Sequence, residues 1–98
     1  MNMIKTLNGT ALTVAVEGRL DTVTAPEFEK DLSNSLSGVT DLTIDFANLE
    51  YISSAGLRAL MAVCKLMRGQ GGMKIKNTNE IVKEVFEVTG FSNILPIE

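Results

Sequence analysis

The chain has 98 residues, 45% of them hydrophobic, and carries a formal net charge of −3 with no histidine. This length supports one hydrophobic core, so we expect one domain over residues 1–98, and the acidic balance without any run of Lys or Arg excludes the electrostatic footprint of a nucleic-acid-binding protein. The absence of histidine excludes Ser-His-Asp triads, Cys-His dyads and imidazole metal sites, so we expect neither an enzyme nor a metal or cofactor site.

The N-terminal part of the chain predicts a β-hairpin. Strands are expected over residues 3–7 and 11–16, and Asn8-Gly9-Thr10 between them supplies a permissive turn. In the second strand the alternation of Leu12, Val14 and Val16 places these three side chains on one face.

The first helix is predicted to begin near Thr24. Thr24 and Glu27 have the spacing of a capping box, and Pro26 falls in the first turn, where a missing N–H does no harm. The apolar stripe of this helix consists of Phe28, Leu32 and Leu36. Ser37-Gly38 is expected to end the helix.

The middle of the chain predicts a buried strand followed by the longest helix. Residues 42–46 form a compact apolar run that is too short for a helix, and residues 48–52 lead from it into Ser53-Ser54-Ala55-Gly56, where the helix begins. The glycines of residues 69–72 end it. Its inward face is expected to hold Leu57, Leu60, Met61, Cys64 and Met67, and its outer face Arg58, Lys65 and Arg68.

Three sulfur-containing residues lie on the inward face of that helix. Cys64 is the only cysteine, and at an apolar helical position we expect a small buried hydrophobe rather than a redox or metal group. Met61 and Met67 could form an adaptable binding surface, but their spacing favours the core.

The C-terminal part predicts a strand, a helix and a last short strand. The strand covers residues 73–76, and Thr78 or Asn79 caps a helix that Gly90 closes. The inward side chains of this helix are expected to be Ile81, Val82, Val85, Phe86 and Val88. Residues 94–97 would form the last strand, at an edge or a sheet end because Pro96 cannot donate to a ladder.

The element order β-β-α-β-α-β-α-β predicts an α/β fold with a single, mostly parallel or mixed sheet and helices packed on it. No apolar stretch approaches the ~20 residues that span a bilayer, and the N-terminus lacks the apolar region of a signal peptide. We therefore expect a cytoplasmic protein without a membrane partner.

The segment from Asp45 to Arg58 resembles the signature of STAS domains, specifically of bacterial anti-sigma factor antagonists, in which a strand leads through Asp-Ser-Ser-Gly-Leu or a close variant into a long helix. The family's Gly-x-Leu-Asp step is matched by Gly18-Arg19-Leu20-Asp21. The resemblance implies partner switching. By this resemblance, the unmodified protein binds an anti-sigma factor that is also a serine kinase, and so frees a sigma factor. Phosphorylation of the protein breaks this complex. A serine phosphatase then removes the phosphate and restores the unmodified protein.

By this resemblance the phosphorylated residue is Ser54. Ser53 stands where the family often has Asp, and Ala55 where a second Ser is common, which leaves Ser53 as a rival acceptor. A serine at a helix start is also a typical N-cap, and capping by Ser53 or Ser54 would by itself explain a serine at this position.

The resemblance also implies a kinase-docking surface, which we expect to consist of Asp21, Thr22, Ser53, Ser54, Gly56, Leu57 and Arg58. Asp21 could instead be a turn or cap aspartate, and Arg58 could pair with a phosphoserine or simply be solvated. Asp45 is expected to make local hydrogen bonds at a strand end. A paired-carboxylate active site of Asp21 and Asp45 is the weaker alternative, because nothing else supplies a base or a metal set.

Two functions of other kinds stay open. One is a scaffold or accessory subunit of a transport or stress-signalling complex that is not phosphorylated. The other is a nucleotide or anion sensor that uses a helix start as its binding site.

Overall fold

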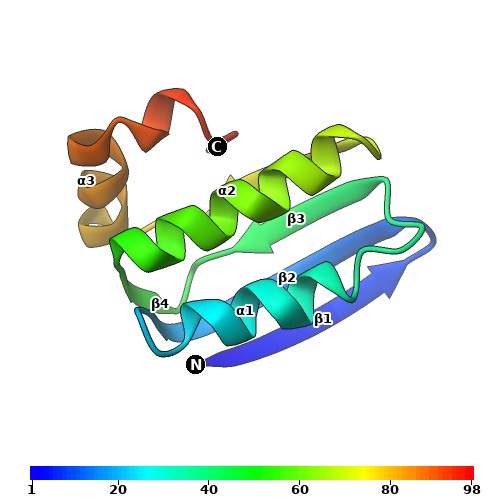
Figure 1. The fold of residues 1–98 in the computed structure, drawn as a ribbon, viewed down its shortest axis with the longest axis horizontal. Coiled ribbons are helices and arrows are strands. Elements are labelled where there is room, and N and C mark those ends of the chain that lie inside the picture. The colour runs from blue at the N-terminus through cyan, green and yellow to red at the C-terminus, as the bar shows by residue number, and fades with distance from the viewer.

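The computed structural model describes residues 1–98 and arranges them around one mixed sheet (Figure 1). The strands are β1 (Asn2–Asn8), β2 (Ala11–Leu20), β3 (Asp41–Asp45), β4 (Leu49–Ile52) and β5 (Gly72–Lys76). The helices are α1 (Ala25–Ser33), α2 (Ser54–Arg68), α3 (Glu80–Thr89) and the short 3₁₀ helix η1 (Phe91–Asn93). The predicted α/β fold class is confirmed.

Strand β2 organises the sheet because it pairs on both sides. Strand β1 runs antiparallel to it, whereas β3 and β5 continue the sheet as parallel strands in the order β1-β2-β3-β5. The last residues of β2 pair with β4, after a register shift between Gly18 and Arg19. Gly18 has a φ of 94°, a conformation that favours glycine, so a glycine is suited to this irregularity.

The predicted element order is wrong in two places. Strand β4 forms where only a lead-in to a helix was expected, because four residues are too few for a clear periodicity. The expected strand over residues 94–97 reduces to a single bridge between Ile75 and Ile97. Helix η1 occupies part of the chain just before it.

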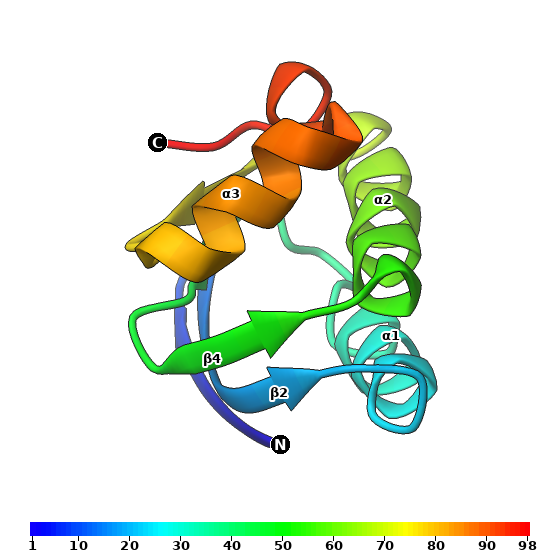
Figure 2. The same ribbon diagram turned by 90° about the vertical axis from the view of Figure 1, so that its left-hand side faces the viewer.

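Helices α1 and α2 lie side by side on one face of the sheet, and α3 lies across the end where β4 is found (Figure 2). The core between sheet and helices is one cluster of 24 buried residues. As predicted, it includes Leu12, Val14 and Val16 of β2, the three apolar side chains of the α1 stripe, and Cys64 of α2. No helix combines the length and apolar character needed to cross a bilayer.

Helices α1 and α2 follow the predicted faces, and α1 begins at the predicted place, but its capping and its C-terminal end differ. Thr24 makes no side-chain capping bond, so the predicted capping box is wrong, and the helix ends at Ser33 rather than at residues 37–38. Leu36 still reaches the core from the following turn. In α2, Met67 is fully buried and Met61 packs half-buried against the core, which confirms their packing role.

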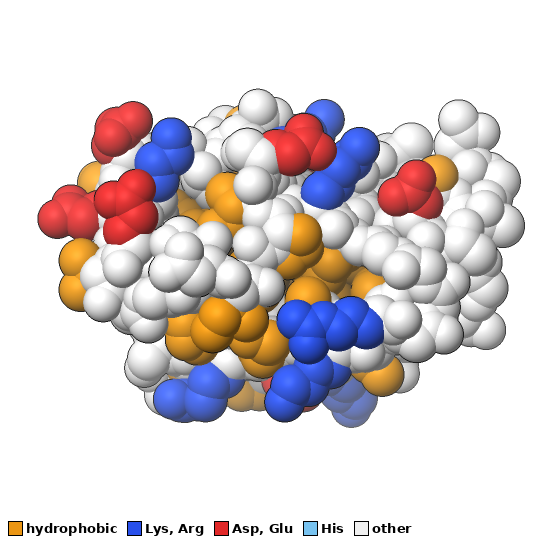
Figure 3. All heavy atoms as spheres, turned by 90° about the horizontal axis from the view of Figure 1, so that it is seen from above, with side chains coloured by type: hydrophobic (Ala, Val, Ile, Leu, Met, Phe, Trp, Pro, Cys, Tyr) orange, Lys and Arg blue, Asp and Glu red, His pale blue; other side chains and the backbone are white.

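Helix α3 has the predicted ends, and Val82, Val85 and Phe86 of its predicted inward face pack on the core, whereas Ile81 and Val88 do not. The Asn79 side chain accepts a hydrogen bond from Val82 N–H at 2.8 Å, and Gly90 ends the helix with a left-handed backbone. Ile81 and Val88 are 58% and 79% exposed, because α3 meets the fold through one narrow stripe only. Acidic side chains gather at this end of the molecule with apolar atoms among them (Figure 3).

Candidate functional site

Asp21 follows β2 and shapes the turn into α1. Its Oδ1 accepts hydrogen bonds from the backbone N–H groups of Val23 and Thr24, both at 3.0 Å. These bonds, that of Thr24 foremost, hold the pKa of the Asp21 carboxyl below its ordinary value. The Thr24 hydroxyl donates to the Arg19 carbonyl at 2.8 Å and accepts from the Asp21 N–H at 2.9 Å. The Thr24 hydroxyl is thus engaged in this turn and does not cap the helix.

The start of α2 is tied to the end of β2. Ser53 has an extended backbone, and its N–H donates to the carbonyl of Leu20 at 2.8 Å. Its own carbonyl accepts the first helical bond, from Leu57 N–H at 3.0 Å. Since Leu20 directly precedes Asp21, the two predicted segments of the docking surface meet at this point.

The two serines at this helix start differ in access. Ser54 is the first residue of α2 and is exposed. The Ser53 Oγ is buried and has no hydrogen-bond partner, and it makes no capping bond. The prediction that one of these hydroxyls caps the helix is therefore not borne out for Ser53, and no hydrogen bond holds the Ser54 hydroxyl either.

Gly56 allows the first turn of α2 to approach β2 and β4 closely. A Cβ at this position would lie 2.7 Å from Ile52 Cγ1 and 3.0 Å from both the Cβ and the carbonyl oxygen of Leu20. Gly56 and Leu57 are both buried, so these two members of the predicted docking surface pack the helix onto the sheet and are not accessible to a docking partner.

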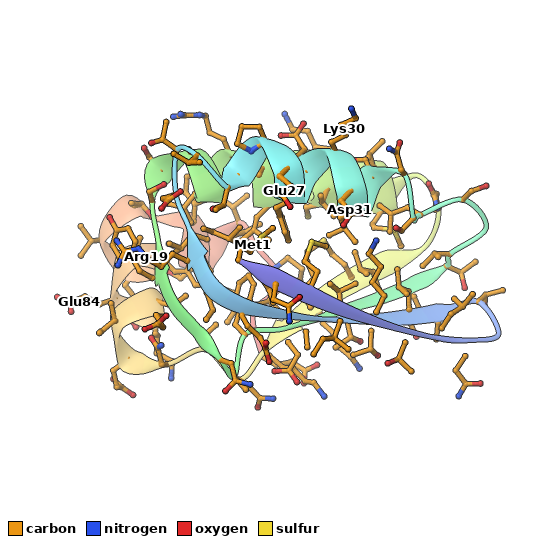
Figure 4. All side chains as sticks on the ribbon, turned by 90° about the horizontal axis from the view of Figure 1, so that it is seen from below. Met1, Arg19, Glu27, Lys30, Asp31 and Glu84 are labelled. Carbon is orange, nitrogen blue, oxygen red and sulfur yellow. The ribbon has the colours of Figure 1, made fainter.

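A groove of about 630 Å³ lies between α1 and α2, next to the start of α2. Its lining residues are Thr22, Ala25, Pro26, Glu29, Lys30, Ser33, Asn34, Ala55 and Arg58. Thr22 and Arg58 were predicted at the site, whereas the α1 residues were not, because only tertiary packing brings that helix beside α2. Figure 4 shows Lys30 on the side of α1 that points away from the sheet.

Two arginine side chains, Arg58 and Arg19, lie near the start of α2 and the Asp21 turn. Arg58 is exposed, and none of the three ion pairs of the chain involves it. The Arg19 guanidinium lies over the Tyr51 ring, 4.8 Å from its centroid, and its Nε is 3.9 Å from Asp21 Oδ2. Neither Arg19 nor Tyr51 was predicted at the site. Tyr51 was missed because it belongs to the unpredicted strand β4. Arg19 could have been found from its position two residues before Asp21.

Asp45 makes local hydrogen bonds, as expected. Its Oδ1 accepts from the Asn77 side chain at 3.0 Å and from Ala47 N–H at 2.9 Å, and these bonds, that of Asn77 foremost, lower its pKa. Asp21 and Asp45 thus serve separate turns, and no group of three or more possible ligands gathers to hold a metal ion. The paired-carboxylate interpretation receives no support.

Comparison with known proteins places the whole chain in one family. The STAS domain profile matches residues 2–98. BtrV of Bordetella bronchiseptica, named as an anti-sigma factor antagonist, is 34% identical over 88 residues, which covers 88% of this chain and 76% of BtrV. The anti-sigma-B factor antagonist of Bacillus subtilis is 29% identical over 91 residues, which covers 92% and 84% of the two chains.

Solved structures share the fold. The anti-sigma factor antagonist SpoIIAA in its unphosphorylated form superposes with a TM-score of 0.84 at 16% identity, over 99% of this chain and 86% of SpoIIAA. The phosphorylated form of Bacillus SpoIIAA gives a TM-score of 0.75 at 15% identity, over 99% and 89%. At these identities the likeness concerns the fold.

Proposed function

The chain belongs to the STAS domain family and to its anti-sigma factor antagonists, and on this premise we propose that it is a switch controlled by phosphorylation of Ser54. In its unphosphorylated form it binds an anti-sigma factor that is a serine kinase, and a sigma factor is released. The observation that carries the proposal is the exposed Ser54 hydroxyl at the first residue of α2 beside the buried Ser53 hydroxyl.

Access and electrostatics both favour Ser54 as the acceptor. A kinase has to reach the hydroxyl, and Ser53 would first have to leave its buried position. A phosphate adds about −1.5 to −2 charges, which the positive end of a helix tolerates well. The first turn of α2 holds no acidic residue that would oppose it. SpoIIAA, whose unphosphorylated and phosphorylated forms both superpose on this chain, is consistent with a fold that accepts the modification.

The same charge would act differently at an interface. Asp21, Thr22, Ser53, Ser54 and Arg58 form the exposed or half-exposed part of the proposed docking surface, although the Oγ atom of Ser53 is itself buried. A phosphate buried there against the kinase would lose its hydration and repel neighbouring carboxylates, so the partner leaves while the fold stays intact.

In this proposal the protein is a regulatory binding partner in the cytoplasm rather than an enzyme. ATP belongs to the kinase, and a separate serine phosphatase restores the free hydroxyl.

The test uses the anti-sigma factor kinase of the same organism, captured on immobilised Ser54→Ala protein, identified by mass spectrometry and then purified. With ATP, the wild type is expected to gain one phosphate, mapped to Ser54 by peptide mass spectrometry. Ser53→Ala is the matched control and should still be phosphorylated, whereas Ser54→Ala should not. A phosphate on Ser53, or none with an active kinase, would overturn the assignment.

A further inference from the structure

The sheet edges along β1 and β5 differ in how far they are covered. Along β5, the Ile75 N–H donates to the Pro96 carbonyl at 2.9 Å and the Glu98 N–H donates to the Ile75 carbonyl at 2.8 Å. The C-terminal segment thus covers part of that edge. Strand β1 pairs with β2 over all of Asn2–Asn8 and with nothing on its other side. It runs along the border of the sheet (Figure 1) and presents a row of unpaired backbone groups.

Strand β1 also lacks the features that usually keep a bare edge from pairing. It contains no proline, and its register with β2 runs without a shift. Its only charged residue is Lys5, whose Nζ lies 2.6 Å from Oδ1 of Asp31 on α1. Figure 4 shows Asp31 on the lower side of α1, toward β1. Ile4 and Leu7 are 52% and 64% exposed, so the strand presents two large apolar side chains, and its single charge is compensated.

We propose that β1 is the interface of a symmetric homodimer, in which two β1 strands pair antiparallel and join the two sheets. This inference does not depend on the proposed function. A second copy fits because the compensated charge of Lys5 removes the repulsion that two identical strands would otherwise meet. The β5 edge is partly occupied by the C-terminal segment, and pairing through β1 alone closes at two subunits about a two-fold axis.

The size of the contact sets its strength. A strand edge of seven residues buries less than the ~800 Å² per partner of a standard stable interface. The dimer should therefore be weak and depend on concentration, with backbone hydrogen bonds as its main specific contacts.

Sedimentation equilibrium of the wild type from about 10 μM to about 1 mM should show a monomer–dimer equilibrium. Ile4→Lys/Leu7→Lys, which places lysines on the edge strand, should stay monomeric over the same range. Ile81→Lys/Val88→Lys on α3 is the matched control, because it makes the same change in charge at exposed apolar positions of a helix and should still dimerise. Circular dichroism confirms that each variant is folded.

Two further measurements test the geometry and the charge compensation. Every second amide of β1 should gain protection from hydrogen exchange as concentration rises, because neighbouring N–H groups of a strand point to opposite sides. Asp31→Asn should weaken the dimer roughly tenfold, and Lys5→Gln/Asp31→Asn should restore it. Three results would each overturn the proposal. The first is a wild type that is still monomeric at about 1 mM, and the second is a dimer that is lost in the α3 variant and kept in the β1 variant. The third is a dimer in which the β1 amides stay unprotected. The monomeric result would leave the edge to an extended segment of another protein.

Discussion

The N–H of Ser53 donates a hydrogen bond of 2.8 Å to the carbonyl of Leu20, the last residue of β2. This bond joins two segments that are far apart in the sequence, the turn that Asp21 organises and the start of α2 that carries Ser54. Both are attached to the sheet, which makes the proposed docking surface a rigid one. A charge placed on Ser54 can then change binding without first changing the fold.

Replacing Ser54 by Asp should weaken binding of the anti-sigma factor kinase by at least about tenfold, or ~1.4 kcal/mol. The added carboxylate must be desolvated at the interface, and it carries about half the charge of a phosphate, so the phosphorylated protein should bind more weakly still. Ser54→Ala should bind like the wild type. Isothermal titration calorimetry of the three proteins measures the difference, and equal affinities for Ser54→Asp and wild type would contradict the charge mechanism.

Replacing Gly56 by Ala should destabilise the fold by about 1–3 kcal/mol, because the new Cβ meets the Ile52 side chain and the Leu20 backbone at distances that force a shift. The gain in helix propensity, at most about 1 kcal/mol, opposes this cost. Gly69→Ala is the matched control, since its Cβ would make only an ordinary contact of 3.7 Å. In urea titrations, the unfolding midpoint of Gly56→Ala should lie well below that of the control. Equal midpoints would show that the start of α2 shifts to accommodate the new Cβ.

The faces of α1 and α2 could be predicted because each packs on the sheet along a full stripe, so apolar spacing and burial agree. The face of α3 was predicted only in part: Val82, Val85 and Phe86 pack on the core, whereas Ile81 and Val88 belong to an apolar pattern that the fold leaves open to solvent. Apolar periodicity indicates which residues could be buried, whereas the extent of burial depends on how much of the sheet the helix covers.

The site was predictable as a segment but not as a surface. The motif located Ser54 and Asp21, whereas the choice between Ser53 and Ser54 depends on the burial of one oxygen atom, which only tertiary structure defines. Tyr51 was missed for the same reason as β4, since a strand of four residues gives too short a pattern. Thr24 had the spacing of a cap, but its hydroxyl is engaged in the preceding turn, where it donates to the Arg19 carbonyl and accepts from the Asp21 N–H.

Stability should fall in acid as the Asp21 and Asp45 carboxylates become protonated. Both have a folded-state pKa below the ordinary value of 3.8, so each stabilises the fold above that pH and loses its contribution as the pH falls through the folded-state pKa. Asp45→Asn should therefore lower stability at neutral pH and reduce the loss on acidification. Asp41→Asn, at an exposed carboxylate without a hydrogen bond in the fold, should follow the wild type. Urea titrations from neutral pH to about pH 3 test this, and parallel curves for Asp45→Asn and wild type would contradict it.

Phosphorylation of Ser54 should leave the stability of the fold nearly unchanged or raise it by about 0.3–1 kcal/mol, because the phosphate lies at the positive end of α2, where N–H groups lack helical partners. Asp21, in the turn anchored beside that helix start, opposes the gain through repulsion, but its Oδ1 is already engaged by two backbone N–H groups. Urea unfolding of the phosphorylated and unmodified proteins measures the difference, with Ser54→Ala treated with kinase as the control for incubation. If the phosphorylated form were less stable by more than about 2 kcal/mol, partner release would follow from local unfolding at the start of α2 rather than from charge on an intact surface. The rigid link between Ser53 and Leu20 would then be the element that breaks, and hydrogen exchange at the Ser53 amide would show it directly.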